Sequence, residues 1–446
     1  MNSELFDPLY NSSPANLAPC RSYWASTTSL GQASPVLSGN RSVDVAVIGG
    51  GYTGLLSAYY LATEHNIDVC VLEANQIGFG ASARNAGFVL KGSGRLGYKQ
   101  MAARWDLDTA KGIYHEFSEA VSRVDGLINE FNIDCEPQQK GYLKVAHNKK
   151  ALEQLQSAAG FIRRELGEDA EFITANRFKT EFMNHQQAFG ALRLADGFGV
   201  NPLKLLLGYK SILQGKSVDL YENTCVTDWL TEGNQHRLIT SRGEIRANKV
   251  ITAGNAYTPK SFSSNIDNRY LPILSNVIVT EPLSEQELLS CGLNTHQVTM
   301  DTRILKYYYR LLPDNRLLFG GRGAIQGKDA NKPIYQKRLK FALDKCFPPL
   351  QQKAVAYNWT GWIAAALDDM PHVYASNGVG YSIGYCGSGV SFSSQAAFRL
   401  AEQIAGKQVP ALPLYQLPLP KFPLPQLRRV GQWGYYHYGW LRDRFL

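Results

Sequence analysis

Apolar residues near the start of the chain fall into two short runs separated by a longer segment with helical spacing. Residues 43–48 (VDVAVI) form the first run and lead directly into three glycines. The segment LLSAYYLATEH follows, and the second run is IDVCVLE. A strand, a helix and a strand within about thirty residues predict a parallel βαβ crossover.

The middle of the chain predicts further helices and a set of antiparallel strands. Residues 102–131 and 148–167 have helical spacing, and GYLKVAH between them alternates as a strand does. The helix LKLLLGYKSIL follows Asn201 and Pro202, which suit the N-cap and the first helical position. Strands are predicted near 217–228, 236–241, 245–252 and within 270–322, with a hairpin around Pro313. Residues 377–406 return to the first pattern of strand, glycine turn and helix.

Length and composition narrow the class of protein. With 446 residues, 44% of them hydrophobic and 19% charged, the chain predicts a globular protein of more than one domain. No apolar stretch approaches the length of a membrane span, and the first residues do not resemble a secretory leader, so a cytoplasmic location is expected. The seven scattered cysteines lack a CxxC pair and the histidines lack ligand spacing, so neither a disulfide framework nor a metal site is expected.

The positive charge is concentrated at the end of the chain. Residues 407–446 contain six Lys or Arg against Asp443 alone, which accounts for +5 of the formal +8. The body is therefore close to neutral, and a groove for nucleic acid is not expected. Residues 428–446 combine four arginines with two tryptophans, three tyrosines and a phenylalanine. Packing within the molecule is favoured for this tail, then an association surface, then membrane contact, because three glycines weaken a continuous amphipathic helix.

The most specific motif is the glycine turn at residues 49–54, between the first strand and the first helix. Gly49 permits a tight turn, Gly51 lets a pyrophosphate approach the backbone, and Gly54 lets the helix pack close to the strand. Glu73 ends the second strand, where a carboxylate can accept ribose hydroxyls. These features predict dinucleotide binding at the helix N-terminus.

Two further segments favour FAD over NAD. The glycine-rich loop at residues 77–92 follows the acidic residue, and Ser82, Arg84 and Asn85 offer donors to phosphate or flavin. Residues 384–389 (GYCGSG) open a late helix whose positive N-terminus could stabilise negative charge on a reduced flavin.

These motifs taken in order resemble the D-amino acid oxidase/dehydrogenase family of FAD enzymes, and within it γ-glutamylputrescine oxidoreductase-like members. The likeness is carried by VDVAVIGGGYTGLLSAYYLA, VLEANQIGFGASARNAGF, ITAGNAYTP, YYRLLPDNRLLFGGR and GYCGSGVSFSS. It implies an α/β (α+β overall) fold with a Rossmann-like FAD-binding domain assembled from distant segments and a substrate domain with an antiparallel sheet. The predicted parts are 1–40, a surface arm; 41–100, 195–258 and 362–406, the FAD-binding domain; 101–194 and 259–361, the substrate domain; and 407–446, a Pro-rich and then aromatic and basic tail.

The resemblance also implies oxidation of a C–N bond in a small amine by hydride transfer to flavin. The product would be an imine that hydrolyses, with oxygen or a respiratory or quinone carrier as electron acceptor. FAD is expected to be bound non-covalently. The candidate cofactor residues are Gly49, Gly51, Tyr52, Thr53, Gly54, Glu73, Ala74, Gly80, Ala81, Ser82, Arg84, Asn85, Gly87, Val226, Ala253, Gly254, Gly387, Gly389 and Val390. The candidate substrate-pocket residues are Lys91, Tyr307, Tyr309, Arg322, Trp362 and Tyr385.

The chain departs from its family at three positions. Ser391 stands where sarcosine-type oxidases carry a Lys, and Ile363 stands where glycine oxidase-like members carry an Arg. The oxygen-activating Lys of sarcosine-type oxidases would fall near Leu318 of this chain. An α-amino acid substrate is therefore less expected than another amine, and no acid–base residue is assigned. Two other functions remain open: a flavin-holding electron-transfer subunit of a hetero-oligomeric dehydrogenase, and a tRNA-modifying flavoenzyme.

Overall fold

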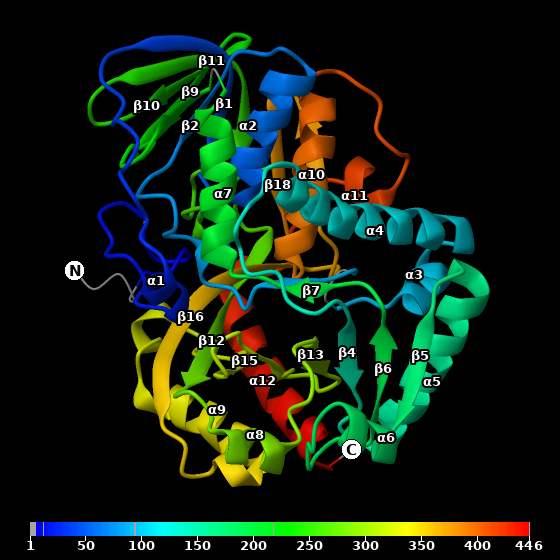
Figure 1. Ribbon diagram of the computed structural model, residues 1–446. Coiled ribbons are helices and arrows are strands. Elements are labelled where there is room, and N and C mark those ends of the chain that lie inside the picture. The colour runs from blue at the N-terminus through cyan, green and yellow to red at the C-terminus, as the bar shows by residue number, and fades with distance from the viewer. Residues whose placement is uncertain (1–5, 12, 93–94, 217, 446) are drawn as a thin grey trace.

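The computed structural model describes residues 6–11, 13–92, 95–216 and 218–445. Two large sheets each organise one half of the molecule, in the upper and lower parts of Figure 1. This arrangement confirms the predicted α/β fold with a second, largely antiparallel sheet.

The upper sheet has a parallel centre with strand order β17-β18-β11-β1-β2-β8. All four residues of β2 are buried, as expected for a central parallel strand covered on both faces. Helices α2, α7 and α10 lie side by side against this sheet (Figure 1). Its elements are β1 (Arg41–Ile48), α2 (Tyr52–Glu64), β2 (Val69–Leu72), α7 (Pro202–Gln214), β8 (Asp219–Tyr221), β9 (Asp228–Glu232), β10 (Gln235–Ile239), β11 (Glu244–Thr252), β17 (His372–Ser376), β18 (Val379–Ile383) and α10 (Gly389–Ile404).

The lower sheet is mostly antiparallel, with strand order β16-β12-β15-β14-β13-β4-β6-β5. Its core contains Tyr309 and Phe319, whose rings are stacked. Phe347, the residue that directly follows α9, packs against Tyr309. Its elements are β4 (Tyr142–Val145), α5 (Lys149–Phe161), β5 (Ala170–Thr174), α6 (Ala175–Glu181), β6 (Gly190–Leu194), β12 (Tyr270–Thr280), α8 (Glu285–Cys291), β13 (Val298–Asp301), β14 (Tyr308–Leu311), β15 (Leu317–Arg322), α9 (Pro333–Cys346) and β16 (Val355–Ala366). A two-stranded sheet of β3 (Phe88–Val89) and β7 (Phe198–Gly199) lies between the halves.

Helix α4 (Leu107–Glu130) belongs with the upper half, although its residues fall in the predicted substrate domain. The Phe117 ring lies 4.7 Å from that of Phe392 on α10. The Glu116 carboxylate accepts a hydrogen bond of 2.7 Å from Arg399 on the same helix. The predicted start of the substrate domain at residue 101 stays a prediction, and the amphipathic pattern of α4 did not say which sheet this helix covers. The short helix α3 (Tyr98–Arg104) precedes α4.

The N-terminal arm is not simply a surface segment. Trp24, in α1 (Tyr23–Thr27), is only 1% exposed, and its indole N–H donates to the backbone oxygen of Asn85. Phe6 is also buried and stacks on Tyr257. The described part of the predicted surface arm is therefore partly buried, because its few aromatic residues pack against distant segments.

The aromatic and basic end of the C-terminal tail forms one continuous helix. After α11 (Pro413–Gln416), helix α12 spans Arg428–Phe445 and crosses the lower half of the molecule (Figure 1, red). Leu446 lies outside the described residues. The three glycines do not interrupt the helix, because polar contacts along its buried side hold it to the lower half.

Candidate functional site

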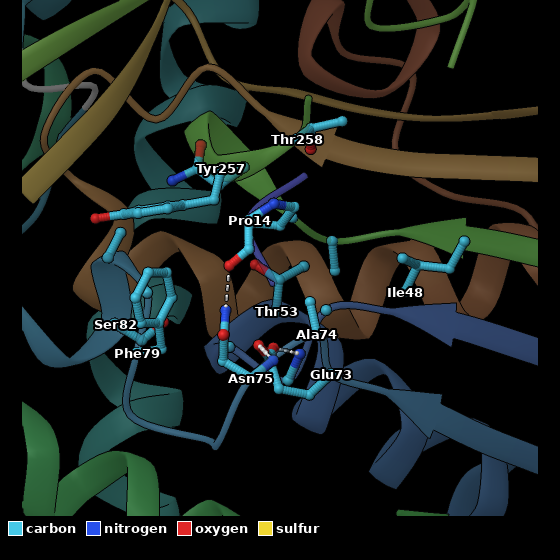
Figure 2. Close-up of a pocket in the computed structure, with 18 of the residues that line it drawn as sticks. Pro14, Ile48, Thr53, Glu73, Ala74, Asn75, Phe79, Ser82, Tyr257 and Thr258 are labelled. Carbon is cyan, nitrogen blue, oxygen red and sulfur yellow. Dashed lines mark hydrogen bonds between the residues drawn. The ribbon is translucent and has the colours of Figure 1, made fainter. Parts of the chain in front are cut away.

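A cavity of about 430 Å³ opens where the carboxyl ends of the upper parallel strands meet β16. Its wall includes Ile48 and Leu72 at the ends of β1 and β2, Thr252 at the end of β11, and Trp362 on β16 (Figure 2 shows part of the wall). In open α/β sheets this edge is where ligands bind.

The glycine turn shapes one end of the cavity. Gly49 has φ +113°, and a Cβ atom there would lie 2.9 Å from the backbone of Ala253. A Cβ on Gly54 would lie 1.9 Å from the Gly49 oxygen, so this position is needed for helix–strand packing. A Cβ on Gly51 would meet only the Ser82 hydroxyl, at 2.9 Å. The first turn of α2 is thus accessible from the cavity, and its free N–H groups can face an anion.

Glu73 sits at the end of β2 with its carboxylate against the turn (Figure 2). Its two oxygens accept hydrogen bonds from the backbone N–H groups of Gly50 (2.7 Å) and Asn75 (3.0 Å). Burial is the largest influence on this carboxyl and raises its pKa, which the two N–H groups partly offset. Glu73 therefore fixes the turn and also presents an acceptor to the cavity.

The residues of the predicted glycine-rich loop differ in what their side chains contact. The Ser82 hydroxyl accepts from the Tyr52 N–H at 3.0 Å, which ties the loop to α2. Asn85 lines the cavity, but its side chain bonds within its own loop, to Ala81, Ser82 and Gly87.

The late glycine turn closes the opposite side. Gly384, Cys386 and Gly387 have φ values of +86°, +51° and +105°, so the chain reverses sharply before α10 begins. Tyr385 lies in this turn, and its hydroxyl bonds to those of Thr53 and Ser382, each at 2.7 Å. Burial raises the pKa of Tyr385 to about 12, so its hydroxyl stays protonated.

Most of the candidate cofactor residues line this single cavity. Those on its wall are Gly49, Gly51, Tyr52, Thr53, Glu73, Ala74, Gly80, Ala81, Ser82, Asn85, Val226, Ala253, Gly254, Gly387, Gly389 and Val390. Gly54, Arg84 and Gly87 are not. Arg84 turns away and donates to the Phe79 oxygen at 2.6 Å, while a Cβ on Gly87 would lie 2.0 Å from the Val200 oxygen. These two residues shape the loop rather than the cavity.

The candidate substrate-pocket residues are divided. Trp362 and Tyr385 line the cavity. Tyr307 and Tyr309 do share a face, but that face packs against the lower core. Lys91 forms ion pairs with Asp196 (2.6 Å) and Glu168 (3.2 Å) instead of facing the cavity.

Tyr308 points the opposite way from its neighbours, toward the upper half. Its hydroxyl lies 2.5 Å from that of Ser275, and its ring packs edge-on against Phe88. Arg322 lies on β15 away from the cavity wall.

Several wall residues were not among the sequence candidates. Ser13 and Pro14 come from the N-terminal arm, and the Pro14 oxygen accepts from the Asn75 amide at 2.7 Å (Figure 2). No local pattern in the arm predicts this contact. Tyr257 and Thr258 lie within the quoted ITAGNAYTP segment, so the family resemblance of that segment was the available signal.

Unpaired polar atoms on the wall indicate what the cavity holds. Four buried wall atoms have no hydrogen-bond partner among the described residues: the Thr252, Thr258 and Ser393 hydroxyls and the Asn255 side-chain oxygen. Buried polar groups normally have partners, so these atoms fit a polar ligand. Together with the space beside Gly51 and the acceptor at Glu73, they suit a dinucleotide.

Comparison with known proteins decides which family this is. The profile described as "DAO: FAD dependent oxidoreductase" matches residues 44–403. The chain belongs to this family. The predicted resemblance and the predicted cofactor, FAD, are both confirmed, and the protein is an FAD-dependent oxidoreductase.

Relatives within this family match over most of their length. The chain is 33% identical to "Gamma-glutamylputrescine oxidoreductase" of Escherichia coli (strain K12) over 389 residues, 86% of this chain and 89% of that protein. It is 24% identical to "Sarcosine oxidase subunit beta" of Arthrobacter sp over 83% of this chain and 89% of that protein. The solved structure of L-proline dehydrogenase from P. horikoshii shares the fold, with a TM-score of 0.69 at 18% identity, over 85% of this chain and 96% of that one.

The cysteines of this FAD-dependent oxidoreductase favour a releasable cofactor. Burial raises the pKa of the Cys386 thiol to about 12 and also raises that of Cys225 on the cavity wall. Protonated thiols are poor nucleophiles. Acid precipitation should therefore release all flavin into the supernatant, measured by its fluorescence. Flavin fluorescence that stays with the denatured polypeptide in a gel would contradict this prediction.

Proposed function

We propose that this FAD-dependent oxidoreductase oxidises a C–N bond of a small amine, such as an acylated polyamine or a secondary amine, and releases an imine that hydrolyses. The observation that carries the proposal is the charge of the cavity wall. Among the described residues that line it, none is a Lys, Arg or His. An amine can enter such a site as the neutral base, whereas an α-carboxylate beside the reacting carbon would find no cation.

The family departures support this reading. The Ser391 hydroxyl donates to the Leu90 oxygen at 2.5 Å, so it is engaged with the protein. Ile363 lies on the cavity wall, and Leu318 is fully buried in the core. None of the three side chains can supply the charge that the related oxidases place there. The relative named gamma-glutamylputrescine oxidoreductase also acts, by its name, on an acylated diamine.

Different elements of the cavity wall would bind different parts of FAD. The N-terminus of α2 would receive the pyrophosphate, Glu73 the adenosine ribose, and the N-terminus of α10 the flavin pyrimidine. FAD, when bound, accepts the hydride from the carbon beside nitrogen. Trp362 and Tyr385 then enclose the amine and exclude water.

A group of cations lies beyond the late glycine turn. Burial, together with Lys144, Arg322 and Arg95, lowers the pKa of Lys306 to about 7. Arg322 and Arg95 also act on Tyr436, which packs beside Cys386 of that turn. Because Arg95 already pairs with Asp369 at 2.8 Å, we assign the other cations of this group to the anionic end of an acylated amine, away from the reacting carbon.

A spectrophotometric screen tests the proposal. Mixed anaerobically with the holoenzyme, an acylated diamine bearing a carboxylate should bleach the flavin. The same amine with that carboxylate amidated should react with at least about tenfold lower kcat/KM, because a charge-assisted contact is lost. Simple α-amino acids should leave the flavin oxidised.

Arg322→Gln provides the matched variant. It should raise KM for the carboxylate-bearing amine and leave kcat and the amidated substrate unchanged. Rapid bleaching by α-amino acids, with amines inert, would contradict the proposed substrate class. Bleaching that needs a second polypeptide would support the alternative, an electron-transfer subunit.

A further inference from the structure

Helix α12 packs against the protein through its polar side and exposes its apolar side, unlike an ordinary surface helix. At 100° per residue, Arg428, Arg429, Gln432 and Asp443 fall within about 100° of one another around the helix, and this side faces the protein. A surface helix normally buries its apolar side and exposes its polar one. Here the polar side is the attached side.

The attachment is specific. Arg428 donates to the Tyr270 oxygen at 2.6 Å, and Arg429 donates to the Pro272 oxygen at 2.8 Å. At the far end, the two Asp443 oxygens accept from the N–H groups of Ile304 (2.8 Å) and Leu305 (2.9 Å). These contacts hold the helix at both ends and fix which side faces outward.

The outward side is apolar and aromatic. The large apolar and aromatic side chains of residues 424–441 that are more than half exposed are Leu424, Leu427, Val430, Trp433, Tyr438, Trp440 and Leu441. Seen down the axis of α12 at 100° per residue, Val430 and Leu441 form the centre of the outward face. Trp433 and Trp440 lie on one side of that centre and Tyr438 on the other.

Basic residues flank this face. Arg442 donates to the Tyr438 hydroxyl at 2.8 Å, and the Arg444 guanidinium lies 5.3 Å from the Trp440 ring centre. Asp443, the sole acid of residues 407–446, is turned inward. A central apolar strip with tryptophans and arginines at its borders is the arrangement that binds the headgroup region of a membrane.

We propose that the outward face of α12 docks this protein on a bilayer that contains anionic lipid, with the helix lying in the plane of the interface. The charge of this face favours a membrane over a second copy of the chain as its binding partner. A two-fold contact through the same face would bring the arginines of two copies together, whereas anionic headgroups complement them. No helix in the described part of the chain is long and apolar enough to cross a membrane.

Vesicle flotation with the full-length holoenzyme tests this proposal. The protein should float with phosphatidylcholine vesicles that contain phosphatidylglycerol, and raised salt should weaken the binding. A triple variant, Trp433→Gln with Trp440→Gln and Leu441→Gln, should bind at least about tenfold more weakly. Its flavin content and its flavin reduction in solution should match the wild type, so the outcome does not depend on the proposed substrate.

The matched control is Leu289→Gln with Phe341→Gln, since both side chains are exposed apolar residues on other helices, α8 and α9. It should bind like the wild type. Absence of wild-type flotation, equal flotation with pure phosphatidylcholine, or equal weakening by the control would each overturn the proposal. So would a dimer that the triple variant dissociates while vesicle binding is absent.

Discussion

Gly51→Val is expected to give a folded but colourless protein, with the flavin content lowered more than about tenfold. Gly51 has an ordinary φ of −83°, so a side chain causes no backbone strain. A Cβ there meets only the Ser82 hydroxyl, and the remaining valine atoms extend into the cavity over the first turn of α2. The Ser82 hydroxyl must turn away from the new Cβ, and the valine then occupies the space of the pyrophosphate without a backbone clash. Absorbance of the purified protein near the flavin bands measures the effect.

Two other glycines make the test selective. Gly126→Val, at an exposed position on α4 with no atom within 4 Å of the new Cβ, should keep its flavin. Gly54→Ala should instead impair folding, because its Cβ would overlap the Gly49 oxygen. If Gly51→Val retains stoichiometric FAD, the pyrophosphate does not lie at this turn.

Glu222→Ala is expected to lower the free energy of unfolding by about 3–5 kcal/mol. Glu222 is fully buried, at 0% exposure, just after β8. One of its oxygens accepts from the Lys210 ammonium at 2.6 Å and from the Ser34 N–H at 2.5 Å, and the other accepts from the Ile77 N–H at 2.6 Å. Alanine would leave a buried ammonium without a counter-charge and two N–H groups without acceptors.

Urea denaturation followed by tryptophan fluorescence, with FAD in excess, measures this loss. Glu222→Gln keeps the shape and should cost less than alanine. The double variant Lys210→Met with Glu222→Leu should recover part of the stability, because no buried charge then lacks a partner. A loss below about 1 kcal/mol for Glu222→Ala would mean that the ion pair contributes little to folding.

The parts of the site that are local in sequence were predictable. The glycine turn and Glu73 lie within one βαβ unit, so their spacing alone brings them together. The late turn before α10 was recognisable for the same reason, since glycine, strand and helix are adjacent in the chain.

Side-chain direction and distant pairing were not predictable. Alternation shows that Tyr307 and Tyr309 share a face, but not that Phe319 and Phe347 form the core on that side. Lys91 was a candidate for the substrate pocket, yet it pairs with Asp196, a residue far along the chain. Such partners depend on the whole fold.

An ion pair joins the two ends of the chain, and its partners are made at opposite ends of synthesis. Asp7 and Arg429 form a buried ion pair of 2.7 Å across 422 positions, and the same arm brings Phe6 to Trp362 and Pro14 to the cavity wall. On the ribosome, Asp7 emerges long before its partner exists. The ion pair can therefore form only after Arg429 has been made, so the full anchoring of the arm beside the cavity is a late step of folding.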